Sequence, residues 1–176
     1  KVRPINPPAP RPPLDARPRK LSVTQVEVWM RDPYAIYARH ILGLHALPKL
    51  DVAPDAADYG TLVHDVMDIF SKKYPCDWPA DAFEQLVEIG DDKFRSILKY
   101  PGVWAFWWPR FLRIAEWLIY MDPGRRVELI KTNSEVRGLI EISSSAGVFV
   151  LTAQADRIDE LKDGTLRIID YKTGSS

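Results

Sequence analysis

Residues 148–174 read VFVLTAQADRIDELKDGTLRIIDYKTG. This stretch holds two runs rich in β-branched residues, 148–155 and 166–171, with the pair Asp163-Gly164 between them. Asp-Gly between such runs is typical of a β-hairpin, because glycine readily adopts the positive φ angle that tight turns require. A third run of the same kind, 136–142, precedes them across a Ser-rich segment. The sequence therefore predicts a three-stranded β-meander in this part of the chain.

Helical periodicity governs the chain before these strands. Ser22-Val-Thr-Gln25 matches a capping box, which predicts a helix that begins near Val23 and ends before Asp32-Pro33. Apolar residues at helical spacing predict further helices over 34–41, 58–73, 80–98 and 103–121. Helices followed by a run of strands indicate a mixed α/β domain of the α+β type.

The last of these helices, 103–121, is dense in aromatic residues, and Pro109 is expected to kink or divide it. Its rings are Trp104, Phe106, Trp107, Trp108, Phe111, Trp117 and Tyr120. Aromatic rings stack on nucleic-acid bases, but so many rings around one helix more often pack in a core or a domain interface. We favour packing and assign this helix no catalytic role.

Composition excludes several classes of protein. Hydrophobic residues make up 46% of the 176 residues and charged residues 27%, which is typical of a globular domain and not of a disordered chain. The apolar runs are shorter than the roughly 18 residues needed to span a bilayer, and no signal-peptide pattern opens the sequence. We therefore expect a cytoplasmic protein with no membrane partner. The single cysteine, Cys76, excludes an internal disulfide and cannot by itself build a zinc or iron–sulfur site.

Positive and negative charges are equal in number over the whole chain, but they are unevenly distributed along the sequence. The 24 basic and 24 acidic residues give a net charge of zero, while residues 1–20 hold six basic residues against one acidic residue and seven of the 15 prolines. We interpret this segment as an extended linker to a domain at 21–176, or as a polyproline ligand for a partner groove around Pro10–Pro13. Since the domain itself is acidic, a free-standing basic DNA-binding protein is excluded.

Charged residues gather where two predicted strands run side by side. Asp156 and Asp170 are expected on neighbouring strands, and Lys172 points to the same face as Asp170 because strand side chains alternate. Two carboxylates suit Mg²⁺ or Mn²⁺, and a lysine nearby can orient water or stabilise charge. The set predicts metal-assisted phosphodiester hydrolysis. The alternative is a surface ion pair, although a carboxylate directly after Ile168-Ile169 favours a functional role.

These motifs resemble the PD-(D/E)xK nuclease superfamily in its RecB-like branch. Besides Asp156 and the DYKTG motif at 170–174, Gly60-x-x-x-His64 resembles the family's histidine helix. The stretch from Leu21 to Tyr34 resembles the family's N-terminal helix and its Cys-Pro-aromatic signature. The motif AQADRID at 153–159 is closer to AddB-type nuclease domains of the alphaproteobacterial kind than to RecB. The resemblance implies a restriction-endonuclease-like core whose strands carry the active site.

The same resemblance implies roles for particular residues. It makes Asp156 and Asp170 metal ligands and Lys172 the catalytic lysine. His64 becomes a further ligand or phosphate contact, and the main-chain carbonyl of Tyr171 also coordinates metal. A family acidic position on the first strand corresponds to Glu135, although a surface glutamate is an equal alternative.

In function, the resemblance implies a Mg²⁺-dependent deoxyribonuclease, an exonuclease, with Mn²⁺ as an alternative cofactor. Its partners are DNA, a helicase portion of the same longer chain and an AddA-like helicase–nuclease subunit, acting in double-strand break repair and recombination. Family members with an iron–sulfur cluster carry Cys where this chain has Asp32, so no cluster is expected. The family continues after DYKTG into a helix bearing Gln-x-x-x-Tyr, and we expect that final helix to be truncated at Ser176.

Two other classes of function stay open. One is a non-catalytic structural or DNA-guiding module that keeps the nuclease fold without turnover, which the acidic domain favours. The other is an unrelated helical domain that binds a partner through its aromatic helix. The nuclease interpretation requires His64, Asp156, Asp170 and Lys172 to converge on one site.

Overall fold

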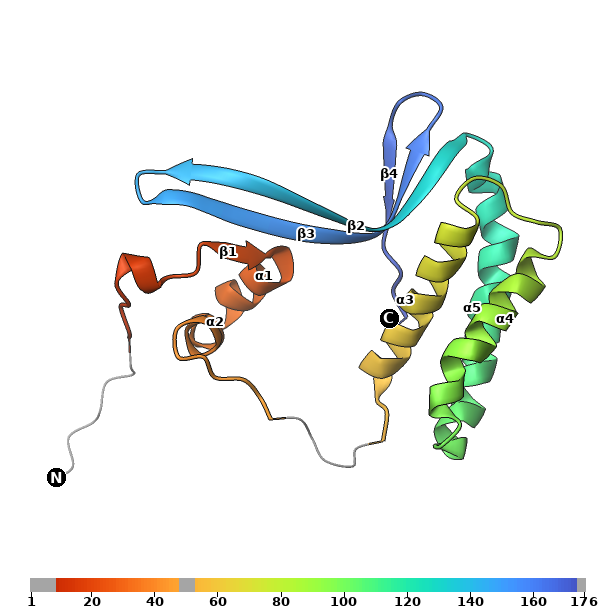
Figure 1. The fold of residues 1–176 in the computed structure, drawn as a ribbon, viewed down its shortest axis with the longest axis horizontal. Helices are drawn as coiled ribbons and strands as arrows, with labels where there is room; N and C mark the ends of the chain where they lie inside the picture. The colour runs from red at the N-terminus through yellow and green to blue at the C-terminus, as the bar shows by residue number, and fades with distance from the viewer. Residues whose placement is uncertain (1–8, 48–52, 174–176) are drawn as a thin grey trace. The chain divides into compact units, whose positions relative to one another are not determined.

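The computed structural model describes residues 9–47 and 53–173 (Figure 1). The chain divides into two units. Unit 1 comprises residues 1–48 and 138–153, and unit 2 comprises residues 49–137 and 154–176. The expected linker, 1–20, lies partly outside the described residues, and its described part contains a short 3₁₀ helix, η1 (Leu14–Ala16), and the first residue of strand β1 (Lys20–Ser22).

In unit 1, two capped helices follow β1. Helix α1 (Val23–Arg31) begins with the predicted capping box: the Ser22 hydroxyl accepts from the Gln25 amide at 3.2 Å, and the Gln25 side chain accepts from the Ser22 amide at 2.9 Å. Helix α2 (Pro33–His40) begins at Asp32, whose carboxylate accepts from the amides of Tyr34 and Ala35. These side chains satisfy amides that a helix N-terminus leaves unpaired. The sequence predicted the cap at Ser22 but not the one at Asp32.

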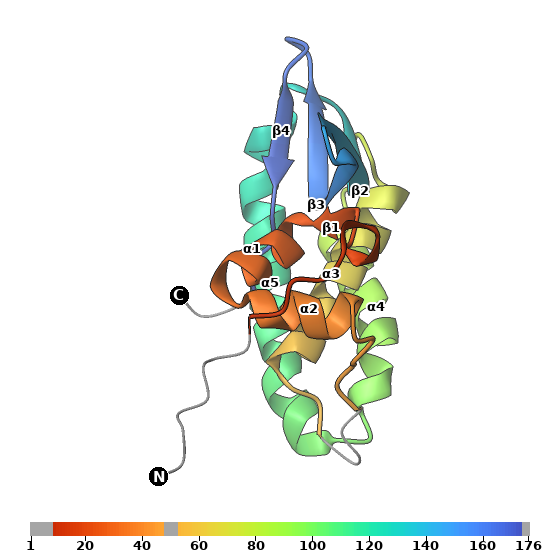
Figure 2. The same ribbon diagram turned by 90° about the vertical axis from the view of Figure 1, so that its left-hand side faces the viewer.

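The sheet is mixed and confirms the predicted meander. Strands β2 (Leu129–Ser144) and β3 (Gly147–Leu161) are hydrogen-bonded neighbours joined by a two-residue turn, and they pass through both units. Strand β4 (Leu166–Ile169) lies beside β3 (Figure 2). The two strands pair antiparallel, with Arg157 opposite Ile169. The expected strand, 166–171, therefore extends beyond the observed strand, which ends at Ile169. Strand β1, which the sequence pattern did not reveal, pairs parallel with β3 through Leu21 and Leu151.

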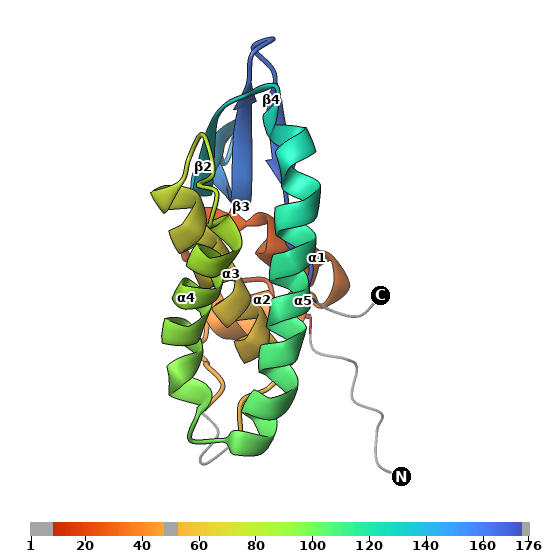
Figure 3. The same cartoon turned by 90° about the vertical axis from the view of Figure 1, so that its right-hand side faces the viewer.

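Three helices of unit 2 enclose the main hydrophobic core. They are α3 (Ala56–Lys73), α4 (Ala82–Phe94, followed by the 3₁₀ turn η2 at Arg95–Ile97) and α5 (Pro101–Arg126), and α4 packs against both others (Figure 3). Fully buried side chains include Val66 and Phe70 from α3, Leu86 from α4 and Phe111 from α5. None of the helices in the described ranges combines the length and apolarity needed to cross a bilayer.

Helix α5 departs from expectation at both prolines. Pro109 lies inside one continuous helix and does not divide it. The helix was also expected to end before Asp122-Pro123, but it continues to Arg126. A proline in a helix removes one backbone hydrogen bond, but here the last turn is held by an ion pair between Arg126 and the buried Asp122, 3.1 Å apart.

The aromatic residues of α5 divide between core and surface. Phe111 is fully buried, and Trp107 and Trp108 pack against the core beside it. Phe106 and Tyr120, in contrast, are about four-fifths exposed. The packing interpretation therefore holds for part of the helix only.

A buried ion network joins α5 to the sheet. Both guanidinium edges of Arg157 are paired: Nε and Nη2 donate to Asp159 at 2.7 and 2.8 Å, and Nη1 donates to Asp122 at 2.9 Å. Thr132 of β2 donates to Asp159 at 2.8 Å. Burial lowers the pKa of Arg157, but its hydrogen bonds with Asp159 and Asp122 outweigh this and raise the pKa overall. The Arg157 guanidinium therefore stays charged, and its hydrogen bonds fix β3 against α5.

Breaking this network should destabilise the protein far more than breaking a surface pair. We expect Arg157→Met to lower the free energy of unfolding by about 3–5 kcal/mol, because the buried Asp159 loses its arginine and the buried Asp122 is left with Arg126 alone. Arg95→Met removes an exposed arginine paired with Asp91 and should change the free energy of unfolding by less than about 0.5 kcal/mol. Urea unfolding followed by tryptophan fluorescence measures both. Equal effects of the two substitutions would contradict the role assigned to the network.

Candidate metal centre

Three side chains from three elements of unit 2 come together. His64 of α3, Glu135 of β2 and Asp156 of β3 each offer one ligand atom, and these atoms lie within 4.8 Å of one another. All three residues are half-buried. Two of them, His64 and Asp156, were expected from the sequence to meet, and the third is the acidic candidate on the first strand of the meander.

The backbone of Tyr171 closes a ring with two of these side chains. His64 Nε2 donates to the Tyr171 carbonyl oxygen at 2.9 Å, while the Tyr171 amide donates to Asp156 Oδ2 at 2.7 Å. His64 Nδ1 lies 3.5 Å from Asp156 Oδ1. The residue whose carbonyl was expected at a metal site thus contacts both the histidine and the aspartate directly.

The Tyr171 side chain anchors this backbone. Its ring packs against the hydrophobic core of unit 2, and burial raises the pKa of its phenol, against the opposing effect of Arg157. Arg157 belongs to the buried ion network and is the neighbour of Asp156 on β3.

Helices α3 and α5 hold the residues that follow. A Cβ atom added at Gly60 would lie 3.2 Å from Thr173 Oγ1, so glycine one turn before His64 leaves room for this segment. Arg110 of α5 donates a short hydrogen bond to the Thr173 carbonyl. The Gly-x-x-x-His spacing therefore has a steric reason: the glycine admits the chain that the histidine contacts.

Glu135 reaches the site from a strained backbone. Its φ angle is +52°, in the left-handed region that residues other than glycine seldom adopt. Such strain concentrates at functional sites, where surrounding contacts enforce it. One of these contacts is a short hydrogen bond that Gln154 donates to Glu135. Another is Ser134, whose hydroxyl donates to Asp68 of α3 at 2.6 Å.

Sequence reasoning missed Gln154, Ser134 and Asp68. Gln154 lies within the AQADRID motif but was given no role. Asp68 follows His64 by one helical turn, so the i to i+4 spacing on α3 was the available signal for it. Nothing in the local sequence distinguished Ser134.

Asp170 and Lys172 lie just beyond the end of β4. The strand register pairs Arg157 with Ile169, and its continuation brings Asp156 opposite Asp170. The Asp170 carboxylate, however, is not in the three-residue cluster: it forms a 2.7 Å ion pair with Lys172, and both side chains are exposed. Hydrogen bonding to Asp170 raises the pKa of Lys172, with a smaller contribution from the charge of Asp156. Gly174 of the DYKTG motif lies outside the described residues.

The donor set fits a hard divalent cation. Two carboxylates and one imidazole, with a main-chain carbonyl beside them, are mostly oxygen ligands of the kind that bind Mg²⁺ and Mn²⁺. Ligands of Mg²⁺ lie at about 2.0–2.1 Å, and so two of them are at most about 4.2 Å apart. Atoms within 4.8 Å of one another need only a small approach to share one ion.

Metal binding should depend on the clustered carboxylates. We expect Asp156→Asn and Glu135→Gln each to weaken Mn²⁺ binding by about tenfold or more, because each removes a negative ligand. Asp91→Asn removes an exposed carboxylate on α4 and should leave the affinity unchanged. Isothermal titration calorimetry measures all three. Equal Mn²⁺ affinity in all variants would place the metal elsewhere.

Comparison with known proteins connects this geometry to a family. An uncharacterized protein of Rickettsia bellii is 30% identical over 158 residues, which are 90% of this chain and 19% of that protein. A protein of Clostridioides difficile that is named as a subunit of an ATP-dependent helicase/deoxyribonuclease is 27% identical over 180 residues, covering 88% of this chain and 15% of that protein. The chain thus spans about a fifth or less of these curated relatives. A sequence model of the PD-(D/E)XK nuclease superfamily matches residues 20–176, and the chain belongs to that superfamily.

Proposed function

We propose that this chain is the nuclease domain of an AddB-type helicase–nuclease protein and hydrolyses DNA phosphodiester bonds with Mg²⁺. The observation that carries the proposal is the meeting of His64, Glu135 and Asp156 around the Tyr171 backbone in a member of a nuclease superfamily. The clostridial relatives named as helicase/deoxyribonuclease subunits support the AddB assignment.

The metal would be held by Asp156, Glu135 and His64, with Asp170 as a further ligand. Mg²⁺, when bound, polarises a phosphoryl oxygen and lowers the pKa of its water. Asp156 is prepared for this role because the Tyr171 amide already orients one of its oxygens. His64 is oriented by the Tyr171 carbonyl in the same way.

Lys172 would bind the scissile phosphate and stabilise its developing charge. The side chain is cationic, since Asp170 raises its pKa, and it is exposed enough to reach a substrate. An exposed ion pair contributes little stability, so Asp170 and Lys172 can separate. Asp170 would then bind the metal and Lys172 the phosphate.

The wider biology follows from the same assignment. We propose an exonuclease that acts in double-strand break repair and recombination in the cytoplasm, on DNA delivered by a helicase portion of the same longer chain. An AddA-like protein would be its partner. Residues 21–176 would form the nuclease domain, and 1–20 a linker.

One observation favours a second candidate, a non-catalytic DNA-guiding module. Asp170 and Lys172 pair with each other outside the three-residue cluster. If that pair persists when DNA binds, the site holds metal without the lysine that hydrolysis requires.

Cleavage of single-stranded DNA separates the two candidates. With Mg²⁺, we expect Asp156→Asn, Asp170→Ala and Lys172→Ala each to reduce the rate of the intact parent protein by about 100-fold or more, because each removes a ligand or the charge-stabilising group. The matched control is Asp163→Asn, an exposed carboxylate in the β3–β4 turn.

The cleavage and metal-binding results distinguish the nuclease from the non-catalytic module. Wild-type cleavage by Asp170→Ala and Lys172→Ala would refute the roles given to these residues. Metal binding without cleavage in the unaltered protein would establish the non-catalytic module instead.

A further inference from the structure

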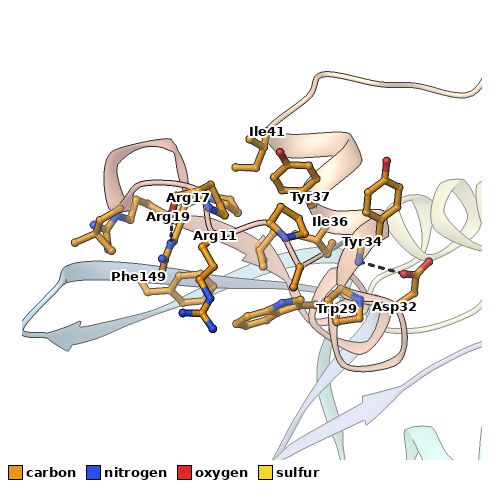
Figure 4. Close-up of a pocket in the computed structure, with 17 residues that line it drawn as sticks. Arg11, Arg17, Arg19, Trp29, Asp32, Tyr34, Ile36, Tyr37, Ile41 and Phe149 are labelled. Carbon is orange, nitrogen blue, oxygen red and sulfur yellow. Dashed lines mark hydrogen bonds between the residues drawn. The ribbon is translucent and has the colours of Figure 1, made fainter. Parts of the chain in front are cut away.

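Unit 1 contains a pocket that takes no part in the metal centre. Its volume is about 720 Å³, within the usual range for ligand pockets (Figure 4). Four aromatic residues line it: Trp29 from α1, Tyr34 and Tyr37 from α2, and Phe149 from β3. The pocket is therefore built from elements that come together only in the folded unit.

Two of the four aromatic residues are exposed, and the other two are half-buried. Half of the Trp29 surface and slightly more than half of the Tyr34 surface are exposed. The rings of Tyr34 and Tyr37 are 5.9 Å apart between centroids and tilted by 35°. Exposed rings of this kind present flat faces on which a planar group can stack.

Three arginines line the same pocket. Arg11, Arg17 and Arg19 are exposed, and in the view of Figure 4 the Arg11 guanidinium extends toward Phe149 and Trp29. Within the described ranges, none of the three takes part in an ion pair. The one acidic residue in the lining, Asp32, already accepts two amides as the cap of α2. The pocket thus offers positive charge to an anionic ligand.

The distribution of charge between the two units also favours an anionic ligand at unit 1. Unit 1 holds eight basic and four acidic residues, a net charge of +4, whereas unit 2 holds sixteen basic and twenty acidic residues, a net charge of −4. The unit that carries the metal centre therefore repels a polyanion. By its net charge, unit 1 is the part of the chain that attracts a polyanion.

We propose that this pocket binds single-stranded DNA, with a base stacked on Trp29 and the tyrosines and the adjoining phosphates held by Arg11, Arg17 and Arg19. Stacking platforms combined with cations are how proteins hold single strands without reading their sequence. The inference rests on the proposed function for its substrate. An aromatic groove also suits a proline-rich peptide, but the three arginines favour a polyanion.

Binding of a fluorescent oligothymidine to the full chain tests the stacking. Anisotropy is measured in EDTA, so that no cleavage occurs. Trp29→Ala should weaken binding about fivefold or more, which is the effect of losing one stacked base. Trp117→Ala is the matched control, since Trp117 of α5 is 52% exposed and lies in unit 2. It should bind as the unaltered protein does.

The arginines are tested by the salt dependence of the same binding. Arg11→Gln and Arg19→Gln should each lower the slope of log affinity against log salt concentration by about 0.7, the value for one phosphate contact to a single strand. Arg39→Gln, an exposed residue of α2 outside the pocket lining, should leave the slope unchanged.

Two results would overturn the inference. One is equal oligothymidine affinity in Trp29→Ala and the unaltered protein. The other is a proline-rich peptide that binds the unaltered protein but not Trp29→Ala, with DNA binding unaffected. Failure of the proposed function gives a different result, namely Trp29-dependent binding without cleavage in Mg²⁺. Cleavage with Trp29-independent binding refutes the pocket alone.

Discussion

The arrangement of unit 2 depends on the buried ion pairs of the Arg157 guanidinium. The guanidinium lies between Asp122 of α5 and Asp159 of β3, and all three side chains are almost completely buried. Charges withdrawn from water are tolerated only when every partner is in place, so the helix and the strand can adopt essentially one relative position. Asp156 is the neighbour of Arg157 on the same strand. The ion network that fixes β3 therefore also fixes the position of Asp156, the catalytic candidate.

Strand alternation separates two sets of side chains on β3. Arg157 and Asp159 point to one face and enter the network, while Asp156 points to the other and meets His64. A shift of β3 by one residue would exchange the two rows, placing unpaired charges in the interior and removing the carboxylate from the site. Register is consequently fixed by the cost of buried charge as well as by the turn at Gly164, whose φ angle is +82°.

Local signals made much of the fold predictable. Ser22 and Gln25 identified a helix start, and Asp163-Gly164 identified the β3–β4 turn, because each acts over a few residues. Strand β1 was missed since its three residues depend on pairing with residues far along the chain. The end of α5 was missed because Asp122, which pairs with Arg126 across the last turn, is buried by a long-range ion pair with Arg157 of β3. At the site, the meeting of His64 and Asp156 followed from the family resemblance, whereas the strained Glu135 backbone and the Asp170–Lys172 pair arise from tertiary contacts.

The hydrogen bond from His64 to Tyr171 has a consequence for the histidine itself. A carbonyl oxygen can only accept, so the proton of the neutral imidazole resides on Nε2 and the lone pair is left on Nδ1. Nδ1 is the nitrogen 3.5 Å from Asp156. The fold thus selects the tautomer before any ligand arrives, in the manner by which outer-shell carbonyls orient metal-binding histidines elsewhere. In that arrangement the Tyr171 carbonyl acts as the tautomer-setting partner of His64, and Nδ1 is the nitrogen that faces Asp156 and is open to a cation.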